Sequence, residues 1–546
     1  MNEEKEKDFD LDGLTAVRRS LEEKMLTRVA QALCLDGRVF EYETALGLPL
    51  TIGSYVELKT RDGKTYLGQI VTREVSVIEG PEYGIGFKGR TGVFGLRGSS
   101  SELRDRLRIR QIRGSGLLLG TIGGDGRVAA ATREDTFVDA ELRGAHDETV
   151  RAYLGYEDPQ YITVQIGRSL YSGGHVRVSL EAKGFDRHTL LCGQTGSGKT
   201  FALGVLLEQL LYNTKLRVIV LDPNSDFVRV GQIKERQDIN KPPSPELSEE
   251  EYDIIRQKHE AVRSSLRVLR PVKRAAGGEG LLRLRFSDLE IFEQARILRL
   301  DPVKDLQEFH TFSEITNLLG DDYSLMDVVT KSSSQVGVRP RAQELAMRIQ
   351  NTGVLGWEIW AGSVGESMVQ VLGSKPRCTV VDLGPLSPVE KQVLCTMVLG
   401  YVWEHRDERE PVLLVVDEAH NVCPQAASSD LEAAAAGYTV RIAGEGRKYR
   451  ISMLLVTQQP SKIHAHVISQ CENLVLMKMN DCGSLKYISE VFSQVAASLV
   501  NEAGGFGQGE ALVSGRIVRS PSFAKFEGRI TQEGGQDMPP TWAAKG

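Results

Sequence analysis

The chain has 546 residues, 41% of them hydrophobic, which provides apolar material for about two to four domains. Its formal net charge of −6 disfavours an outer surface that coats open DNA, although a ring can confine its cations to a narrow pore. The N-terminus is charged and no run of about eighteen apolar residues occurs, so we expect neither a signal peptide nor a membrane span. Seven cysteines without a Cys-x-x-Cys pair predict a reduced, cytoplasmic protein with no disulfide framework and no structural zinc.

The first part of the chain predicts a tail, a helix and a small barrel. Residues 1–35 combine an acidic tail with apolar positions at helical spacing over Leu14–Cys34. Residues 36–155 carry short apolar stretches bounded by turns, which predict strands at Tyr55–Thr60, Lys64–Thr72, Tyr83–Phe94 and Gly116–Ile122. The first two flank an Arg-Asp-Gly turn and form a hairpin candidate. We expect a small antiparallel β-barrel that serves assembly or docking rather than catalysis.

Residues 160–546 predict an α/β domain. Continuous Val, Ile and Leu runs are typical of strands that are buried on both faces of a parallel sheet. They occur at Thr189–Cys192, Leu216–Leu221, Cys378–Leu383, Val412–Val416 and Ile451–Val456. The charge-rich interval of about 234–371, with amphipathic stretches such as Glu249–Leu269, predicts a mainly helical insertion into this core.

The strand that ends at Cys192 runs directly into a Walker A sequence, Gly-x-x-x-x-Gly-Lys-Thr. Such a loop turns successive backbone N–H groups toward a polyphosphate, and the following helix adds its positive N-terminal dipole. We expect Lys199 to reach the β- and γ-phosphates of ATP and Thr200 to ligate Mg²⁺. The predicted nucleotide-binding residues are Gly193, Gln194, Thr195, Gly196, Ser197, Gly198, Lys199, Thr200 and Phe201.

A second apolar strand, Val412–Val416, ends in two carboxylates in a Walker B pattern. Asp417 is expected to hold the Mg²⁺ shell, and Glu418 to orient and polarise the water that attacks the γ-phosphate. The alternative, a buried strand with an acidic exit turn, loses weight beside a complete Walker A loop.

Two further strands end in polar residues near the predicted phosphate site. Asp222 follows the strand after the Walker A helix, where it would contact the lytic water or the Mg²⁺ shell, or else cap a turn before Pro223. Gln458 follows the strand Ile451–Val456, and its amide suits a γ-phosphate sensor because it both donates and accepts hydrogen bonds. A plain strand-end turn is the alternative for Gln458.

A basic cluster, Gly-Glu-Gly-Arg-Lys-Tyr-Arg, lies between the Walker B strand and the sensor strand. In ring ATPases an arginine of one subunit stabilises the transition state at its neighbour's γ-phosphate. Arg447 is our choice for this role, with Arg441 and Arg450 as rivals, and a solvated helix end as the alternative. The cations of Lys331–Arg341 and Lys462–His466 suit either DNA-gripping loops or solvated surface.

Taken together, these motifs resemble the HerA branch of the HerA/FtsK superfamily. The resemblance lies in Arg187–Thr200, Leu221–Asn224, Val416–Asn421, Gly444–Lys448, Thr457–Ser461, Val467–Cys471 and Gly509–Gly515, and in the predicted N-terminal barrel. Two departures stand out. Asn224–Phe227 replaces the Gly-Glu-Tyr or Gly-Glu-Phe of many relatives, and Gln-Gln-Pro at Gln458–Pro460 replaces the commoner Gln-Arg-Pro.

The resemblance implies a RecA-like P-loop ATPase core that forms a homohexamer and threads double-stranded DNA through a central channel as a translocase or helicase. It also implies a partner on the barrel: a NurA-like nuclease in DNA-end repair, or a nuclease or sirtuin-like effector in anti-phage defence. Two other functions stay open at this point. One is an ATP-gated ring scaffold that assembles and activates an effector enzyme, and the other is a conjugation-type pumping ATPase.

Overall fold

The computed structural model describes residues 30–44, 50–78, 109–154, 161–171, 176–239, 248–271, 280–335, 337–339, 341–361 and 366–534. The chain divides into two compact units. Unit 1 contains the N-terminal part up to residue 157 together with residues 171–176, and unit 2 contains residues 158–170 and 177–546. Within the described ranges, no helix combines the length and apolar character that a membrane span requires.

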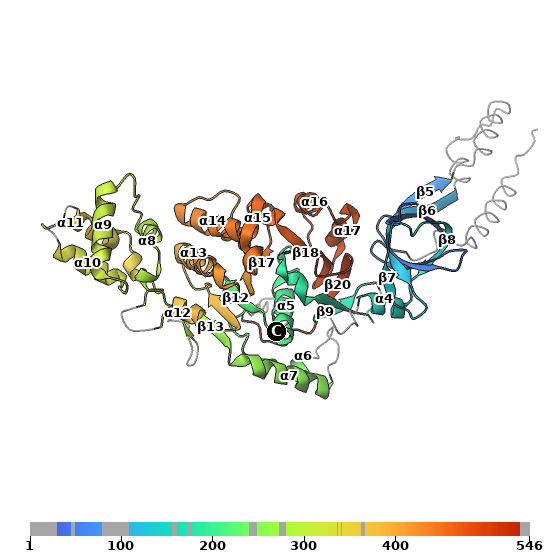
Figure 1. Cartoon of the computed structure of the whole chain (residues 1–546), viewed down its shortest axis with the longest axis horizontal. Helices are drawn as coiled ribbons and strands as arrows, with labels where there is room; N and C mark the ends of the chain where they lie inside the picture. Colours follow the sequence, from blue (N-terminus) through green and yellow to red (C-terminus); the bar gives the residue numbers. More distant parts are fainter. Residues whose placement is uncertain are drawn as a thin grey trace, which may run out of the picture. The chain divides into compact units, whose positions relative to one another are not determined.

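Unit 1 is an antiparallel barrel followed by one short helix (Figure 1). Its strands pair in the order β2-β1-β8-β3-β4-β6, and β2 also pairs with β6, so six strands close on themselves and have no free edge. Two short strands, β5 and β7, pair with the long strand β6. The elements are β1 (Gln31–Cys34), β2 (Val39–Thr44), β3 (Tyr55–Lys59), β4 (Thr65–Ile70), β5 (Glu74–Ile78), β6 (Ile109–Ile122), β7 (Val128–Ala130), β8 (Phe137–Gly144) and α4 (Asp147–Leu154).

The predicted hairpin is confirmed by the pairing of β3 with β4, and the predicted strand Gly116–Ile122 is the end of β6. The predicted helix is wrong at its end, because Gln31–Cys34 forms β1 and buries alternate residues, the period of a strand. Residues 14–29 and the predicted strand Tyr83–Phe94 lie outside the described residues.

The barrel core is aromatic. Phe40 and Tyr42 are buried on β2, and they pack with buried residues of the other strands, Ala32, Cys34, Leu58, Tyr66, Ile70, Ile112 and Leu142 among them. Two glycines leave room for the Phe40 ring, since a Cβ on Gly116 would lie 2.2 Å, and one on Gly68 2.5 Å, from ring atoms. The fold therefore needs glycine at these two positions to close the barrel around this side chain.

Glu57 on β3 is the buried carboxylate that ties the barrel to α4. Its oxygens accept hydrogen bonds from Arg143 Nη2 at 2.8 Å, from His146 Nδ1 at 2.9 Å and from Thr149 Oγ1 at 3.0 Å. Burial raises the pKa of Glu57, but the hydrogen bonds from His146, Arg143 and Thr149 outweigh it and lower the pKa to about 2. The ionised form is therefore the one that the fold stabilises.

We expect Glu57→Gln to destabilise unit 1 by about 2 kcal/mol near neutral pH, the usual cost of losing buried hydrogen bonds to a charged group. The folded pKa of Glu57 is below its ordinary value of 4.5, so its contribution is complete above that pH and is lost as the pH falls toward about 2. Urea unfolding across this pH range measures the difference, with exposed Glu41→Gln on β2 as the control. An equal loss in the two variants would contradict this account.

Unit 2 is built on a sheet of twelve strands in the order β10-β9-β20-β19-β18-β11-β17-β16-β12-β15-β13-β14. The eight strands from β18 to β14 pair in parallel, and the remaining strands extend the sheet antiparallel from β18. The strands are β9 (Thr163–Ser169), β10 (Arg177–Glu181), β11 (His188–Cys192), β12 (Arg217–Asp222), β13 (Leu266–Arg270), β14 (Gly280–Leu281), β15 (Cys378–Asp382), β16 (Val412–Val416), β17 (Ile451–Thr457), β18 (Cys471–Met477), β19 (Glu510–Ser514) and β20 (Ser522–Phe526).

The five predicted strands of the parallel sheet are confirmed as β11, β12, β15, β16 and β17, which are buried along almost their whole length. The helices of unit 2 are α5 (Lys199–Asn213), α6 (Arg236–Ile239), α7 (Glu249–Arg263), α8 (Ile291–Ile297), α9 (Leu306–Leu319), α10 (Leu325–Ser334), α11 (Ala342–Asn351), α12 (Met368–Gly373), α13 (Pro388–Glu404), α14 (Asp430–Glu445), α15 (Ala465–Ser469), α16 (Cys482–Val491) and α17 (Ala497–Asn501). In Figure 1, α9, α10 and α11 gather into one helical group, and α13 lies beside α14.

The interval of about 234–371 supplies α6 to α12 but is not helical throughout. The amphipathic stretch Glu249–Leu269 is helical only to Arg263, because Leu266–Arg270 forms β13 and pairs with β15 at one side of the parallel sheet. A capping box on Ser248 begins α7, since its side chain accepts the N–H of Glu251. Part of this mainly helical interval therefore completes the core sheet, through β13 and β14.

Candidate nucleotide-binding site

The Walker A loop connects β11 to α5 at the carboxyl edge of the parallel sheet, where α/β proteins place ligands. Gly196 and Gly198 have φ of +75° and +98°, a backbone region that glycine enters without strain. The Nζ of Lys199 donates to Gln194 O at 3.0 Å, across the loop. Burial lowers the pKa of Lys199, and the charges of Glu418 and Asp417 oppose that shift.

The ends of neighbouring strands hold this loop in place. Gly193 N donates to Thr457 O at the end of β17, and Gln194 N donates to Lys478 O just after β18. Phe201 follows on the first turn of α5, half-buried, with Lys234 Nζ 5.9 Å from the centre of its ring. All the residues predicted from the Walker A sequence therefore lie on one loop and the helix that it begins.

Asp417 and Glu418 follow β16 at the same edge of the sheet. Burial raises the pKa of Asp417 to about 8, and the nearby charge of Glu418 adds to the shift. Glu418 has a left-handed backbone, with φ of +47°. Its Oε2 is buried without a hydrogen-bond partner among the described residues, and His420 Nδ1 lies 3.4 Å from it. Such a carboxylate oxygen is free to accept a proton or a water molecule.

Gln458 links the two motifs. Its Nε2 donates to Glu418 Oε1 at 2.6 Å, and its Oε1 accepts the hydroxyl of Thr195 on the Walker A loop. The amide thus both donates and accepts, the property that made it a sensor candidate. Both hydrogen bonds are made by the same Gln458 amide. A ligand that breaks the Thr195–Gln458 hydrogen bond would therefore also alter the hydrogen bond from Gln458 to Glu418.

The carboxylate of Asp222 caps the turn that follows β12 and does not face the Walker A loop. Both of its oxygens accept backbone N–H groups, among them those of Asp226 at 3.0 Å and Phe227 at 2.8 Å. The prediction that Asp222 contacts the nucleotide or Mg²⁺ shell is corrected, since its carboxylate is fully buried and occupied by the turn that follows β12. Asp226 is the carboxylate that meets the Walker A helix here, because its Oδ2 accepts the Thr200 hydroxyl at 3.3 Å.

The residues present fit a nucleoside triphosphate with a divalent cation. The Ser197 hydroxyl inside the Walker A loop is buried without a hydrogen-bond partner among the described residues. Around Lys199, the carboxyl groups of Asp417 and Asp226 have raised pKa values, so a bound divalent cation would favour their ionised forms. Thr200 and Asp417 offer the hydroxyl and carboxylate oxygens that Mg²⁺ prefers.

Arg447 lies at the other edge of the sheet. It belongs to a short 3-10 helix, Gly446–Tyr449, that directly precedes β17, and its Nη1 lies 3.6 Å from Glu472 Oε1 at the start of β18. The length of β11, on the order of 15 Å, separates this amino edge from the Walker A loop. Arg447 is therefore remote from the phosphate loop of its own chain and exposed, as an arginine that serves another subunit would be.

The two rivals of Arg447 differ in their surroundings. The Arg441 guanidinium lies over the ring of Tyr438 on the same helix, 5.8 Å from its centre. Arg450 ends the 3-10 helix with a positive φ of 63°. Two other arginines, Arg187 and Arg516, form ion pairs with Glu472, so this carboxylate gathers guanidinium groups at the amino edge.

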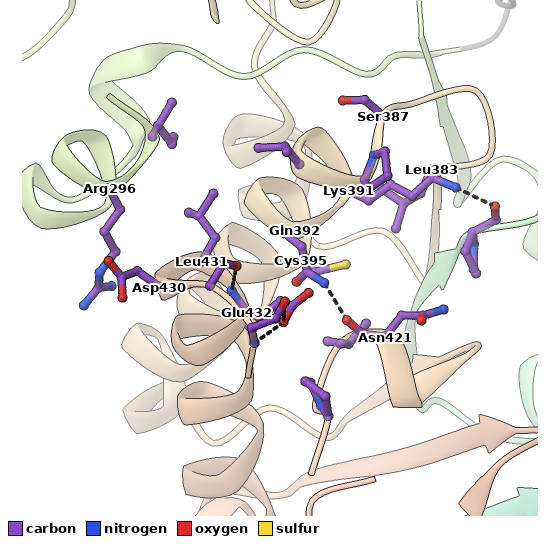
Figure 2. Close-up of a pocket in the computed structure, with 18 of the residues that line it drawn as sticks. Arg296, Leu383, Ser387, Lys391, Gln392, Cys395, Asn421, Asp430, Leu431 and Glu432 are labelled. Carbon is purple, nitrogen blue, oxygen red and sulfur yellow. Dashed lines mark hydrogen bonds between the residues drawn. The ribbon is translucent and has the colours of Figure 1, made fainter. Parts of the chain in front are cut away.

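A cavity of about 1690 Å³ opens beside Asp417 and Glu418, and it is lined by the loop after β16, by the start of α13 and by the end of α8 (Figure 2). Figure 2 shows the Arg296 side chain beside Asp430, while Gln392 Nε2 donates to Asn421 O. Both Asp417 and Glu418 line this cavity.

The cations proposed as DNA-gripping candidates are in part already paired. Arg339 forms an ion pair with Glu314, and Arg341 donates to Glu344. Lys462 and His466 are exposed on the segment after β17, and Lys462 also lines the cavity. The ion pairs of Arg339 and Arg341 favour the solvated-surface interpretation for that segment.

The family model that describes the central domain of helicase HerA matches residues 164–401. The DNA double-strand break repair helicase HerA of Pyrococcus furiosus is 23% identical over 442 residues, which cover 69% of this chain and 73% of that protein. This chain is a HerA-type ATPase. The HerA of Sulfurisphaera tokodaii is 24% identical over 67% of this chain and 70% of its own length, and a probable helicase of Methanocaldococcus jannaschii is 24% identical over 66% and 67%.

Solved structures are also similar to this HerA-type chain. VirB4 of Thermoanaerobacter pseudethanolicus is 18% identical, with 67% of this chain and 96% of that chain covered and a TM-score of 0.44. The bacterial conjugative coupling protein TrwB is 11% identical, with 69% and 90% covered and a TM-score of 0.41.

Two residues of the HerA-type site escaped the sequence analysis. Asp226 lies four residues beyond the strand end at which Asp222 was expected to act, so only the geometry of the turn reveals which one faces Thr200. His420 follows the Walker B carboxylates by two residues, and its Nδ1 lies 3.1 Å from Thr457 Oγ1 and near Glu418. The available signal in the sequence was the position of His420, which follows Asp417, Glu418 and Ala419 directly.

Proposed function

We propose that this HerA-type chain is one subunit of a homohexameric ring that hydrolyses ATP with Mg²⁺ and moves double-stranded DNA through its centre. The observation that carries the proposal is the separation within one subunit of the two halves of an ATPase site. The Walker A and B residues lie at the carboxyl edge of the sheet, whereas Arg447 lies at the amino edge. A ring brings the arginine of one subunit to the phosphates held by the next.

In the proposed reaction, the Walker A N–H groups and Lys199 bind and orient the triphosphate, and Glu418 accepts a proton from the attacking water. Mg²⁺, held by Thr200 and by Asp417, would neutralise charge on the phosphates. Gln458 reports the state of the site, because its amide contacts both the Walker A loop and Glu418. Arg447 of the neighbouring subunit would complete the site.

Duplex DNA is the substrate that the relatives suggest, since several are named DNA double-strand break repair helicases. A net charge of −6 suits a motor that keeps its cations inside a channel and grips the DNA backbone without reading its sequence. We place the ring in the cytoplasm, with a NurA-like nuclease or an anti-phage effector docked on the barrel. DNA repair and antiviral defence are the two roles that follow.

Displacement of a third strand from a triplex-bearing linear duplex tests this proposal. A translocating ring should release the third strand only when ATP and Mg²⁺ are present, and analytical ultracentrifugation of the same sample should give the mass of six chains. A ring that hydrolyses ATP but releases no third strand would overturn the motor in favour of the ATP-gated scaffold. A monomer with full activity would overturn the shared site.

A further inference from the structure

The end of the described chain lies across the Walker A helix. This C-terminal strap, residues 529–534, is held by Glu208 on α5, a carboxylate that is 1% exposed. Glu208 accepts the N–H of Ile530 at 2.9 Å and the N–H of Thr531 at 2.7 Å, and it accepts the Thr531 hydroxyl as well. A buried carboxylate with this many donors fixes the strap to α5.

Arg529 begins the strap and is 2% exposed, which is unusual for a guanidinium group. Its Nη1 donates to the backbone carbonyl of Thr200 at 3.1 Å, and its Cζ lies 5.4 Å from the centre of the Phe227 ring. The group packs directly on Gly204 of α5, where an added Cβ would lie 2.3 Å from Arg529 Nε. The cation therefore occupies a site built for it beneath the first turn of the Walker A helix.

The strap also holds the residue that faces Thr200. Gly534 N donates to Asp226 O at 3.0 Å, while Asp226 Oδ2 accepts the Thr200 hydroxyl. Thus the start of the strap holds the backbone of Thr200, and its end holds the backbone of Asp226. Both members of the Thr200–Asp226 pair are therefore in contact with the strap.

Arg529 also balances charge. The acids Asp226, Asp417 and Glu418 gather at the carboxyl edge of the sheet, and Lys199 is the buried cation that the Walker A motif supplies. Arg529 is another buried cation, and its charge acts on Asp226 and on Glu208. Its Nη1 lies 3.9 Å from Glu533 Oε1 in the strap. Removal of a buried cation leaves nearby carboxylates uncompensated and weakens the geometry that they maintain.

We propose that Arg529 is a positioning residue of the nucleotide site, which sets Thr200 and Asp226 for Mg²⁺ from the C-terminal strap. This inference rests on the proposed function, in which Thr200 ligates Mg²⁺. Outer contacts of this kind commonly govern metal affinity by about tenfold or more. Arg529 touches no reacting atom, so its loss acts on the metal-dependent part of nucleotide binding.

The experiment measures binding of a fluorescent ATP analogue to the full chain, with and without Mg²⁺. Arg529→Ala should weaken binding about tenfold in Mg²⁺ and leave binding without Mg²⁺ unchanged, and Arg529→Lys should restore part of the loss because it keeps the charge. Gln532→Ala is the matched control, since within the described part of the chain that strap side chain donates to the carbonyl of Ile233 and not to Thr200 or Asp226.

Gly204→Ala provides a second variant that leaves Arg529 in the sequence. Its methyl group must displace the guanidinium, so it should produce the same Mg²⁺-specific loss as Arg529→Ala. In the double variant the methyl group meets no guanidinium, and Gly204→Ala should then cost nothing further. Independent, additive losses would contradict displacement as the cause.

Each outcome decides the inference. Equal weakening with and without Mg²⁺ would mean that Arg529 only supports the fold, and wild-type binding that ignores Mg²⁺ would overturn the inference as well. A Mg²⁺-specific loss in Arg529→Ala supports it even if the wild type fails to displace a third strand. In that case the motor proposal fails on its own test and the positioning role stands.

Discussion

Glu418→Gln is expected to lower ATP hydrolysis at least about a hundredfold and to leave ATP binding nearly intact. Glutamine keeps the size of the side chain and can still meet Gln458, but it cannot accept a proton from the attacking water. Glu418 is well placed for this role, because its Oε2 is buried without a hydrogen-bond partner among the described residues and the residue lines the cavity beside the site. Steady-state phosphate release and analogue binding measure the two effects.

Glu432→Gln is the matched control for this variant. Glu432 lines the same cavity and accepts the hydroxyl of Ser428, but it lies on α14 away from the Walker motifs. It should retain wild-type hydrolysis. If Glu418→Gln hydrolysed ATP at the control rate, another residue would have to activate the water, and the proposed mechanism would be wrong.

Arg447→Ala is expected to lower hydrolysis by about a thousandfold or more, the effect of removing an arginine that stabilises phosphoryl transfer. The cause is the loss of a positive charge at the neighbour's γ-phosphate, so ATP binding by the same subunit should persist. Arg441→Ala and Arg450→Ala serve as comparisons. Arg441 is held over Tyr438, and both lie on the same stretch of chain as Arg447.

Mixed rings distinguish action within a subunit from action across an interface. Lys199→Ala subunits keep Arg447 but bind no productive ATP, and Arg447→Ala subunits keep the Walker A loop. Where the two meet in the correct order, one complete site forms, so the mixture should hydrolyse ATP although each variant alone is inactive. An inactive mixture of well-formed rings would indicate that Arg447 acts in its own chain or not at all.

Local motifs made the centre of the site predictable from the sequence. The Walker A residues lie on one continuous loop, and five strands of the sheet, though not their order, were predictable from runs of apolar residues typical of strands buried on both faces of a parallel sheet. Gln458 and Glu418 are 40 residues apart, yet they meet because both end adjacent parallel strands. Sequence reasoning succeeds here because the ends of neighbouring strands converge.

The parts that escaped prediction depend on tertiary contacts. Asp222 and Asp226 are chemically alike, and only the turn after β12 decides which carboxylate faces Thr200. Arg529 reaches Thr200 from 329 residues away, a distance that no local pattern spans. The segment Leu266–Arg270 continues an amphipathic pattern but becomes a strand, because pairing with β15 stabilises it more than a longer helix would.

In the proposed motor, ATP hydrolysis is coupled to movement on duplex DNA. Steady-state ATP hydrolysis by the purified chain, measured with and without linear duplex DNA, tests this coupling most directly. The account predicts strong stimulation by duplex DNA that disappears in Glu418→Gln. Hydrolysis that is indifferent to DNA, at any protein concentration at which rings form, would contradict it.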